Sequence, residues 1–80
     1  MLEGNILLAD TYNHRLRLLD LKDRTIRTLH GGPGQLNEPG GLAVLKGIVY
    51  IADTNNHRIV RYDPKAEKAD VLGIHFQTPR

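Results

Sequence analysis

Ile6-Leu7-Leu8-Ala9-Asp10-Thr11-Tyr12-Asn13-His14-Arg15-Leu16 is followed, 43 residues later, by Val49-Tyr50-Ile51-Ala52-Asp53-Thr54-Asn55-Asn56-His57-Arg58-Ile59. Six positions of the two stretches are identical and stand in the same order: Ala, Asp, Thr, Asn, His and Arg. Chance does not produce a match of this length, so the chain contains an internal repeat, and the period of the repeat is that of a stacked architecture.

Each copy of the repeat has the same order of apolar runs and polar turns. Runs of about five residues that are separated by turn residues predict strands, because a helix needs ten or more residues of 3.6 periodicity. The sequence predicts three strands in the first copy and four in the second, seven in all. They lie at Asn5 to Ala9, Arg15 to Leu19 and Thr25 to Leu29, and at Gly41 to Leu45, Gly47 to Ala52, Arg58 to Tyr62 and Lys68 to Leu72.

The apolar pattern indicates how these strands are buried. Ile6 to Ala9 and Ile48 to Ala52 are apolar at every position, so we expect both faces of these strands to be covered. Arg15 to Leu18 alternates with period two, which is typical of a strand with one wetter face. Small antiparallel sheets that cover one another are typical of a propeller. The predicted fold is all-β: a β-propeller fragment of two four-stranded antiparallel blades, the first lacking its innermost strand.

The repeat also predicts how the chain is divided. Residues 1–30 form the incomplete first blade of three strands, 31–40 a Gly-rich blade-to-blade connection, 41–73 the complete second blade, and 74–80 an entry loop toward a following blade. Phe76-Gln77-Thr78-Pro79-Arg80 mirrors Leu36-Asn37-Glu38-Pro39-Gly40, which precedes the strand that begins at Gly41. We expect either a fragment or a unit that other copies must complete.

Asn13-His14-Arg15 and Asn56-His57-Arg58 occupy the place of the Asn-His-Leu tripeptide that gives the NHL-repeat family its name. With the entry segment Leu36 to Val44, they make the chain resemble that family, in the version found in bacterial and thioredoxin-fused members. The resemblance implies a propeller that closes with about six blades. The resemblance also implies two candidate activities. Some NHL propellers bind RNA through a basic face, and one family of NHL-type propellers is a zinc-dependent lyase acting on carbinolamides.

The repeated turn contains a carboxylate, a hydroxyl and an imidazole, yet we interpret it as a structural motif. We expect the aspartates to accept backbone N–H bonds across a tight turn and Asn13 and Asn56 to take the left-handed conformation. His14 and His57 stand at equivalent points of neighbouring blades, which argues against a shared zinc ion. We therefore predict no catalytic residue, no metal and no cofactor. The motif comprises Asp10, Thr11, Asn13, His14, Arg15, Asp53, Thr54, Asn56, His57 and Arg58.

Two further features have structural interpretations. His30 and His75 close the outer strands without an acid or cysteine at ligand spacing, so we expect partly exposed residues at strand ends. Gly31-Gly32-Pro33-Gly34 lacks the following Lys-Ser or Lys-Thr of a phosphate-binding loop. A flexible connection is the favoured interpretation of this glycine-rich segment.

Composition sets the outer limits on function. The chain of 80 residues has no cysteine and a net charge of +2, which is too mild to indicate nucleic-acid binding by itself. No apolar stretch approaches the roughly 20 residues of a membrane span, and Met1 to Gly4 lacks the basic start of a signal peptide. We therefore expect no membrane contact, and a cytoplasmic location fits slightly better than secretion.

Four arginines recur on corresponding strands and are the candidates for a recognition surface: Arg15, Arg17, Arg58 and Arg61. RNA or another polyanion is the ligand such a surface would take. The few aromatic residues offer no stacking platform, and we expect Tyr50 to be buried. Solvated arginines paired with nearby aspartates are the favoured interpretation.

The leading functional hypothesis is a non-catalytic protein-interaction or assembly scaffold that associates with itself to complete a propeller. Two blades alone leave an apolar face bare at each end. Three copies would give six blades in a closed ring, although the rest of a larger propeller or a protein or peptide ligand could also cover these faces. Polyanion binding is the first alternative, and a part of a zinc-dependent lyase propeller is the second.

Overall fold

The computed structural model describes residues 4–32 and 34–73 and shows two antiparallel sheets. Two short 3-10 turns, η1 (Thr11–Asn13) and η2 (Thr54–Asn56), are the helical elements of this part of the chain. The predicted all-β fragment with one three-stranded and one four-stranded sheet is confirmed. The first sheet has the order β1-β2-β3, with β1 (Asn5–Asp10), β2 (Arg15–Asp20) and β3 (Thr25–Gly31); the second has the order β4-β5-β6-β7, with β4 (Pro39–Leu45), β5 (Ile48–Asp53), β6 (Arg58–Asp63) and β7 (Lys68–Leu72).

Strand β7 has its predicted range, and the other six strands differ from theirs by one or two residues. Strands β1, β2, β5 and β6 each include the aspartate at their end, because its backbone still pairs across the hairpin, as Asp10 does with Arg15. The connection is shorter than the predicted 31–40, since Gly31 ends β3 and Pro39 begins β4. The predicted entry loop at 74–80, with His75 in it, lies outside the described residues.

One extra residue distinguishes β3 from its counterpart in the second sheet. Leu16 pairs with His30 and Arg17 pairs with Thr28, so Leu29 bulges out of the ladder. In the second sheet Ile59 pairs with Leu72 and Val60 pairs with Val71 without any shift. The bulge makes Gly31 the structural counterpart of Gly73. Gly31 follows the partner of Leu16, the second residue of β2, and Gly73 follows the partner of Ile59, the second residue of β6.

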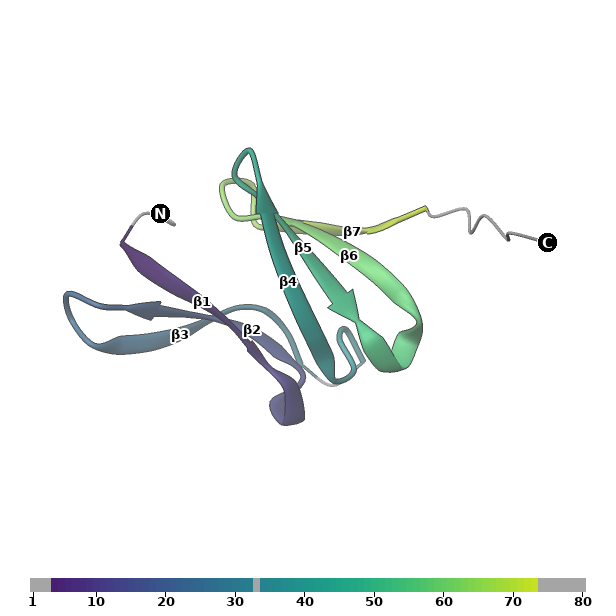
Figure 1. Cartoon of the computed structure of the whole chain (residues 1–80), viewed down its shortest axis with the longest axis horizontal. Coiled ribbons are helices and arrows are strands. Elements are labelled where there is room, and N and C mark those ends of the chain that lie inside the picture. Colours follow the sequence, from purple (N-terminus) through teal and green to yellow (C-terminus); the bar gives the residue numbers. More distant parts are fainter. Residues whose placement is uncertain (1–3, 33, 74–80) are drawn as a thin grey trace.

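The core lies between the two sheets, which stand side by side with β1 next to β4 (Figure 1). Leu16 of the first sheet and Ile51 of the second are both 0% exposed. Leu36 comes from the connection rather than from a strand, and at 1% exposure it fills the space between the sheets. The buried cluster consists of Leu16, Leu36, Val49, Ile51, Val60 and Tyr62, with Leu7, Leu29 and Leu42 packed at its margin.

Each sheet turns one face to this core and leaves the other open. The open face of the first sheet carries Ile6, Leu8, Asp10, Arg15, Arg17, Leu19, Ile26 and Thr28, and the open face of the second carries Ala43, Leu45, Ile48, Tyr50, Ala52, Ile59, Arg61, Asp70 and Leu72. The expectation that the apolar strands are covered on both faces is therefore wrong for this chain. Ile6 is 41% exposed and Tyr50 is only half-buried, because no third sheet packs against either open face among the described residues.

Candidate functional site

The two repeated turns fold in the same way and place histidine at the critical backbone position. His14 and His57 take the left-handed conformation with φ of 59° and 55°, and the N–H of each donates to the carbonyl of the threonine three residues earlier. The expectation that Asn13 and Asn56 would take this conformation is wrong. Their amide side chains instead hold the aspartate that ends the preceding strand.

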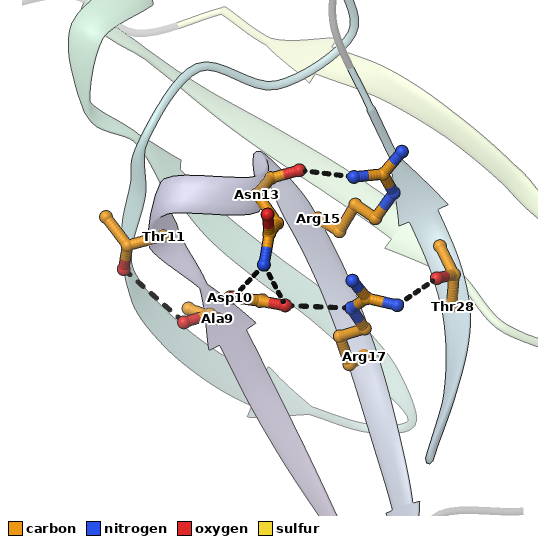
Figure 2. Close-up of polar contacts among 7 residues, drawn as sticks. All are labelled: Ala9, Asp10, Thr11, Asn13, Arg15, Arg17 and Thr28. Atoms are coloured by element: carbon orange, nitrogen blue, oxygen red, sulfur yellow. Dashed lines mark hydrogen bonds and ion pairs between the residues drawn. The ribbon is translucent and has the colours of Figure 1, made fainter.

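The carboxylate of Asp10 is held by side chains rather than by the backbone of its own turn (Figure 2). It accepts from Asn13 Nδ2 at 3.1 and 3.2 Å and from Arg17 Nε at 2.9 Å. The guanidinium of Arg17 also donates to Thr28 Oγ1 on β3 at 2.9 Å. Neither Asp10 nor Asp53 makes the predicted side-chain cap on its own turn, because the neighbouring amide and guanidinium groups take up the carboxylate.

Asp53 makes one contact that Asp10 lacks among the described residues. It accepts from Asn56 Nδ2 at 2.9 Å, from Arg58 Nε at 2.7 Å and from the backbone N–H of Asn37 at 2.7 Å. Burial alone would raise the pKa of Asp53, but these three donors, with the Asn37 N–H first, hold it below its usual value. Hydrogen bonding from Asn13, with Arg17, likewise lowers the pKa of Asp10.

The segment Gln35–Pro39, called here the connection segment, is clamped between the two turns. On the side of the first turn, the Glu38 N–H donates to His14 Nδ1 and Thr11 Oγ1 donates to the Pro39 carbonyl, both at 3.0 Å. The His14 carbonyl accepts from the Gly32 N–H at 2.7 Å. These bonds tie the connection to the blade that it leaves.

On the side of the second turn, the connection segment meets a different set of groups. Besides the bond from Asn37 to Asp53, the Asn55 N–H donates to the Asn37 carbonyl at 3.1 Å and Arg58 Nη2 donates to the Gln35 carbonyl at 2.7 Å. These bonds and the buried Leu36 fix the connection segment in place. An apolar residue standing alone between polar ones, as Leu36 does, was the signal for this anchor.

Gly31 allows the connection to pass close to the first turn. Its φ is +110°, and a Cβ at this position would lie 2.6 Å from the His14 carbonyl oxygen and 3.0 Å from the Cα of Arg15. Those are backbone atoms that cannot give way without moving the turn. Glycine is therefore required where β3 leaves the first sheet.

His30 lies half-buried in β3, one residue before its end, as expected for a partly exposed residue. Its ring stacks on Tyr62 of the second sheet with a centroid distance of 5.4 Å and an interplanar angle of 26°. Burial lowers the pKa of His30, and Arg58 adds to this while Asp53 opposes it. Burial also raises the pKa of the Tyr62 phenol.

The four candidate arginines do not share one surface, because they lie on three sheet faces. Arg15 and Arg17 lie on the open face of the first sheet, Arg58 on the inner face of the second, and Arg61 on the open face of the second. Arg17, Arg58 and Arg61 pair with Asp10, Asp53 and Asp70 at 2.9, 2.7 and 2.6 Å, and Arg15 donates to the Asn13 carbonyl.

In residues 4–32 and 34–73, no three His, Cys, Asp or Glu side chains are grouped so that they could hold a metal ion. No helix in this part is long and apolar enough to cross a membrane.

Equivalent residues of the two turns differ in exposure, and the differences show which contacts are missing. The side chain of Asp53 is 0% exposed, whereas that of Asp10 is 33% exposed. The opposite holds on the other side of the turn, where His14 is half-buried and His57 is exposed. Likewise, Thr11 is half-buried and Thr54 is exposed. Among the described residues, therefore, no segment covers the aspartate side of the first turn, and none covers the threonine and histidine side of the second.

A comparison with protein-family models matches residues 36–62 to the NHL repeat. The match begins at the buried Leu36 and ends at Tyr62, so it takes in the connection segment from Leu36 on, β4, β5, η2 and β6. A search of curated proteins finds no match. Outside the matched range, the first turn repeats Asp, Thr, Asn, His and Arg at the same spacing and has its histidine in the same left-handed conformation. The chain therefore contains an NHL repeat, at residues 36–62.

Proposed function

We propose that this chain is a non-catalytic assembly and interaction module that completes a β-propeller by associating with further copies of itself. One observation carries the proposal: its two open faces are the repeat equivalents of the two faces that already pack together inside the chain. A module of this kind needs no catalytic group. Its first partner is another copy, and a protein ligand would bind to the completed assembly.

The equivalence follows from the repeat offset of 43 residues. Ile6 and Leu8 on the open face of the first sheet correspond to Val49 and Ile51, which are 0% exposed in the core. On the other side, Ile59 on the open face of the second sheet corresponds to Leu16, which is also 0% exposed. The second sheet of one copy can therefore stack on the first sheet of the next as the two sheets stack in one chain.

This contact is heterologous, because each copy contributes a different surface to it. A head-to-tail contact gives a closed ring when its rotation closes and an open filament when it does not. Three copies of two blades each give a six-bladed ring. We propose the trimer because the ring covers both open faces of every copy, whereas a dimer joined by this contact leaves one of each uncovered.

Energetics favour association. Ile6 is 41% exposed and Leu45 is 59% exposed, and full burial of a side chain of this size contributes roughly 1.5–3 kcal/mol. The charged groups on the open faces oppose association less than isolated charges would, because Arg17 pairs with Asp10 and Arg61 pairs with Asp70. Polyanion binding is not proposed, since the arginines lie on separate faces and three of them are already paired.

A pair of variants tests the head-to-tail arrangement. Ile6→Asp disables the open face of the first sheet and Ile59→Asp that of the second, and each variant alone is expected to be a folded monomer by circular dichroism and light scattering. Mixed in equal amounts, the two variants are expected to form a dimer and nothing larger, because one intact face of each remains. A mixture that stays monomeric, or single variants that associate like the unaltered chain, would refute the proposal.

Ile26→Asp is the matched control. Ile26 lies on the same open face as Ile6 and is 57% exposed, but its equivalent Ala69 stays exposed although the first sheet packs on that face. We expect this variant to associate as the unaltered chain does.

A further inference from the structure

We infer that Phe76–Pro79 of one copy dock onto the first turn of the next copy, in the way that Leu36–Pro39 dock onto the second turn within the chain. Residues 76–79 lie outside the described residues, and the occupant is identified from its sequence pattern and from the exposed groups of the first turn. The inference rests on the proposed self-association and adds which residues make the contact. It makes the first turn a receptor that is incomplete without a second copy.

The two segments share the same chemical pattern. Leu36-Asn37-Glu38-Pro39 and Phe76-Gln77-Thr78-Pro79 each have a large apolar residue, a carboxamide, a polar residue and a proline. In the first segment the apolar residue is 1% exposed in the core, and the carboxamide residue donates its backbone N–H to Asp53. Phe76 is thus the equivalent anchor, and the Gln77 backbone the equivalent donor.

The spacing along the chain from turn to segment is three residues shorter for Phe76–Pro79 than for Leu36–Pro39. The structure accounts for this difference. One residue is the bulge at Leu29, which β7 lacks. The other two fall in the stretch after Gly31, where the Gly32 carbonyl accepts from the N–H groups of Gln35 and Leu36. A hydrogen-bonded turn of this kind brings the residues at its two ends close together. A chain without the turn therefore spans nearly the same distance.

The receptor side of the contact is present and unoccupied among the described residues. Asp53, Asn55 and Arg58 bind the connection segment, and their equivalents are Asp10, Tyr12 and Arg15. Asn55 bonds to Asn37 through its backbone N–H, so Tyr12 can make the same bond although its side chain differs. The side chain of Asp10 is 33% exposed, and Tyr12 as a whole residue is 86% exposed. Both are therefore accessible to a docking segment.

The other side of the segment would be held by its own chain. Thr11 and His14 bind the carbonyl of Pro39 and the N–H of Glu38, and their equivalents are Thr54 and His57. Both are exposed. Phe76–Pro79 would therefore bridge the second turn of one copy and the first turn of the next, which explains why the two turns are open on opposite sides.

Cysteine pairing tests the placement, because the chain has no cysteine of its own. Tyr12→Cys and Gln77→Cys are prepared as separate variants of the whole chain. Mixed and mildly oxidised, they are expected to form a covalent dimer of one copy of each. Either variant alone should stay largely monomeric on a non-reducing gel, because a head-to-tail contact never brings two equivalent positions together. Mixed disulfides no more frequent than those of the single variants would overturn the inference.

A second measurement tests the hydrogen bond itself. Gln77→Pro removes the backbone N–H, while Gln77→Ala keeps it. We expect Gln77→Pro to weaken association at least tenfold and Gln77→Ala to change it less than twofold, because a bond to a carboxylate is among the stronger ones. Equal association of the two variants would contradict the inference. An unaltered chain that associates without forming the mixed disulfide would refute the docking alone, whereas a monomeric unaltered chain would refute the proposed function as well.

Discussion

Asp10 and Asp53 stand at the same position of the two repeats, yet the side chain of Asp53 is 0% exposed and that of Asp10 is 33% exposed. The difference arises because the Asn37 N–H reaches Asp53 from the connection segment at 2.7 Å. The carboxylate of Asp53 therefore holds the connection between the two sheets, while that of Asp10 is held by residues of its own sheet.

Asp53→Asn is expected to lower the free energy of unfolding by about 1.5–3 kcal/mol, because it weakens three hydrogen bonds to a buried charge. Urea unfolding measures the loss, and Asp10→Asn, at the more exposed equivalent, is expected to cost less. The folded-state pKa of Asp53 is below its ordinary value, so its contribution is complete above about pH 4 and is lost as pH falls toward the folded-state pKa. An Asp53→Asn variant as sensitive to acid as the unaltered chain would contradict this.

Leu36→Ala tests whether the connection is an anchor. Leu36 is 1% exposed within the core, and removal of a buried leucine side chain costs about 2–5 kcal/mol. Leu21→Ala is the control, since Leu21 is 51% exposed and its truncation should cost under about 0.5 kcal/mol. Urea unfolding in sulfate, which strengthens the fold, keeps a folded baseline for the weaker variant. Equal midpoints for the two variants would show that the connection does not anchor the blades.

Gly31→Ala and Gly73→Ala form a matched pair at structurally equivalent positions. Gly31 has φ of +110° and a Cβ there would lie 2.6 Å from the His14 carbonyl oxygen, whereas a Cβ on Gly73 would meet nothing within 4 Å. We expect Gly31→Ala to destabilise the chain by at least about 1 kcal/mol and Gly73→Ala to change it little. Thermal unfolding of both variants checks the difference, and a destabilised Gly73→Ala with a stable Gly31→Ala would reverse the assignment.

His30 should make stability depend on pH in the mildly acidic range. Burial holds its folded-state pKa below the ordinary value of about 6.5, so the unfolded chain takes up the proton first as pH falls. The contribution of His30 is complete above about pH 6.5 and decreases as pH falls from there toward the folded-state pKa. His30→Phe keeps a ring against Tyr62 and removes the titration. Unfolding at pH 7.5 and pH 5 should show a smaller difference for this variant than for the unaltered chain.

Most of the fold follows from the sequence because apolar runs of strand length and a repeat of 43 residues leave few alternatives. The strands, their division into a sheet of three and a sheet of four, and the similarity of the two turns are all visible in that pattern. The exact ends of the strands are not, since an aspartate such as Asp10 is both the last ladder residue and the first turn residue. The local composition favours assigning Asp10 to the turn, whereas its backbone pairing with Arg15 makes it the last residue of the strand.

The details of the site were harder to predict. Asparagine tolerates the left-handed conformation better than most residues, but here the amide of Asn13 bonds to Asp10 and His14 takes that conformation instead. The separation of the arginines could have been predicted, because the repeat offset aligns Arg17 with Val60 and Arg61 with Leu18. Residues one position apart in register lie on opposite faces of a strand.

Self-association through the two open faces is tested most directly by the mass of the chain in solution. Light scattering after gel filtration at micromolar concentration should give three times the 9.0 kDa of one chain. A single species of 9.0 kDa that unfolds cooperatively at the same concentration would contradict the central claim.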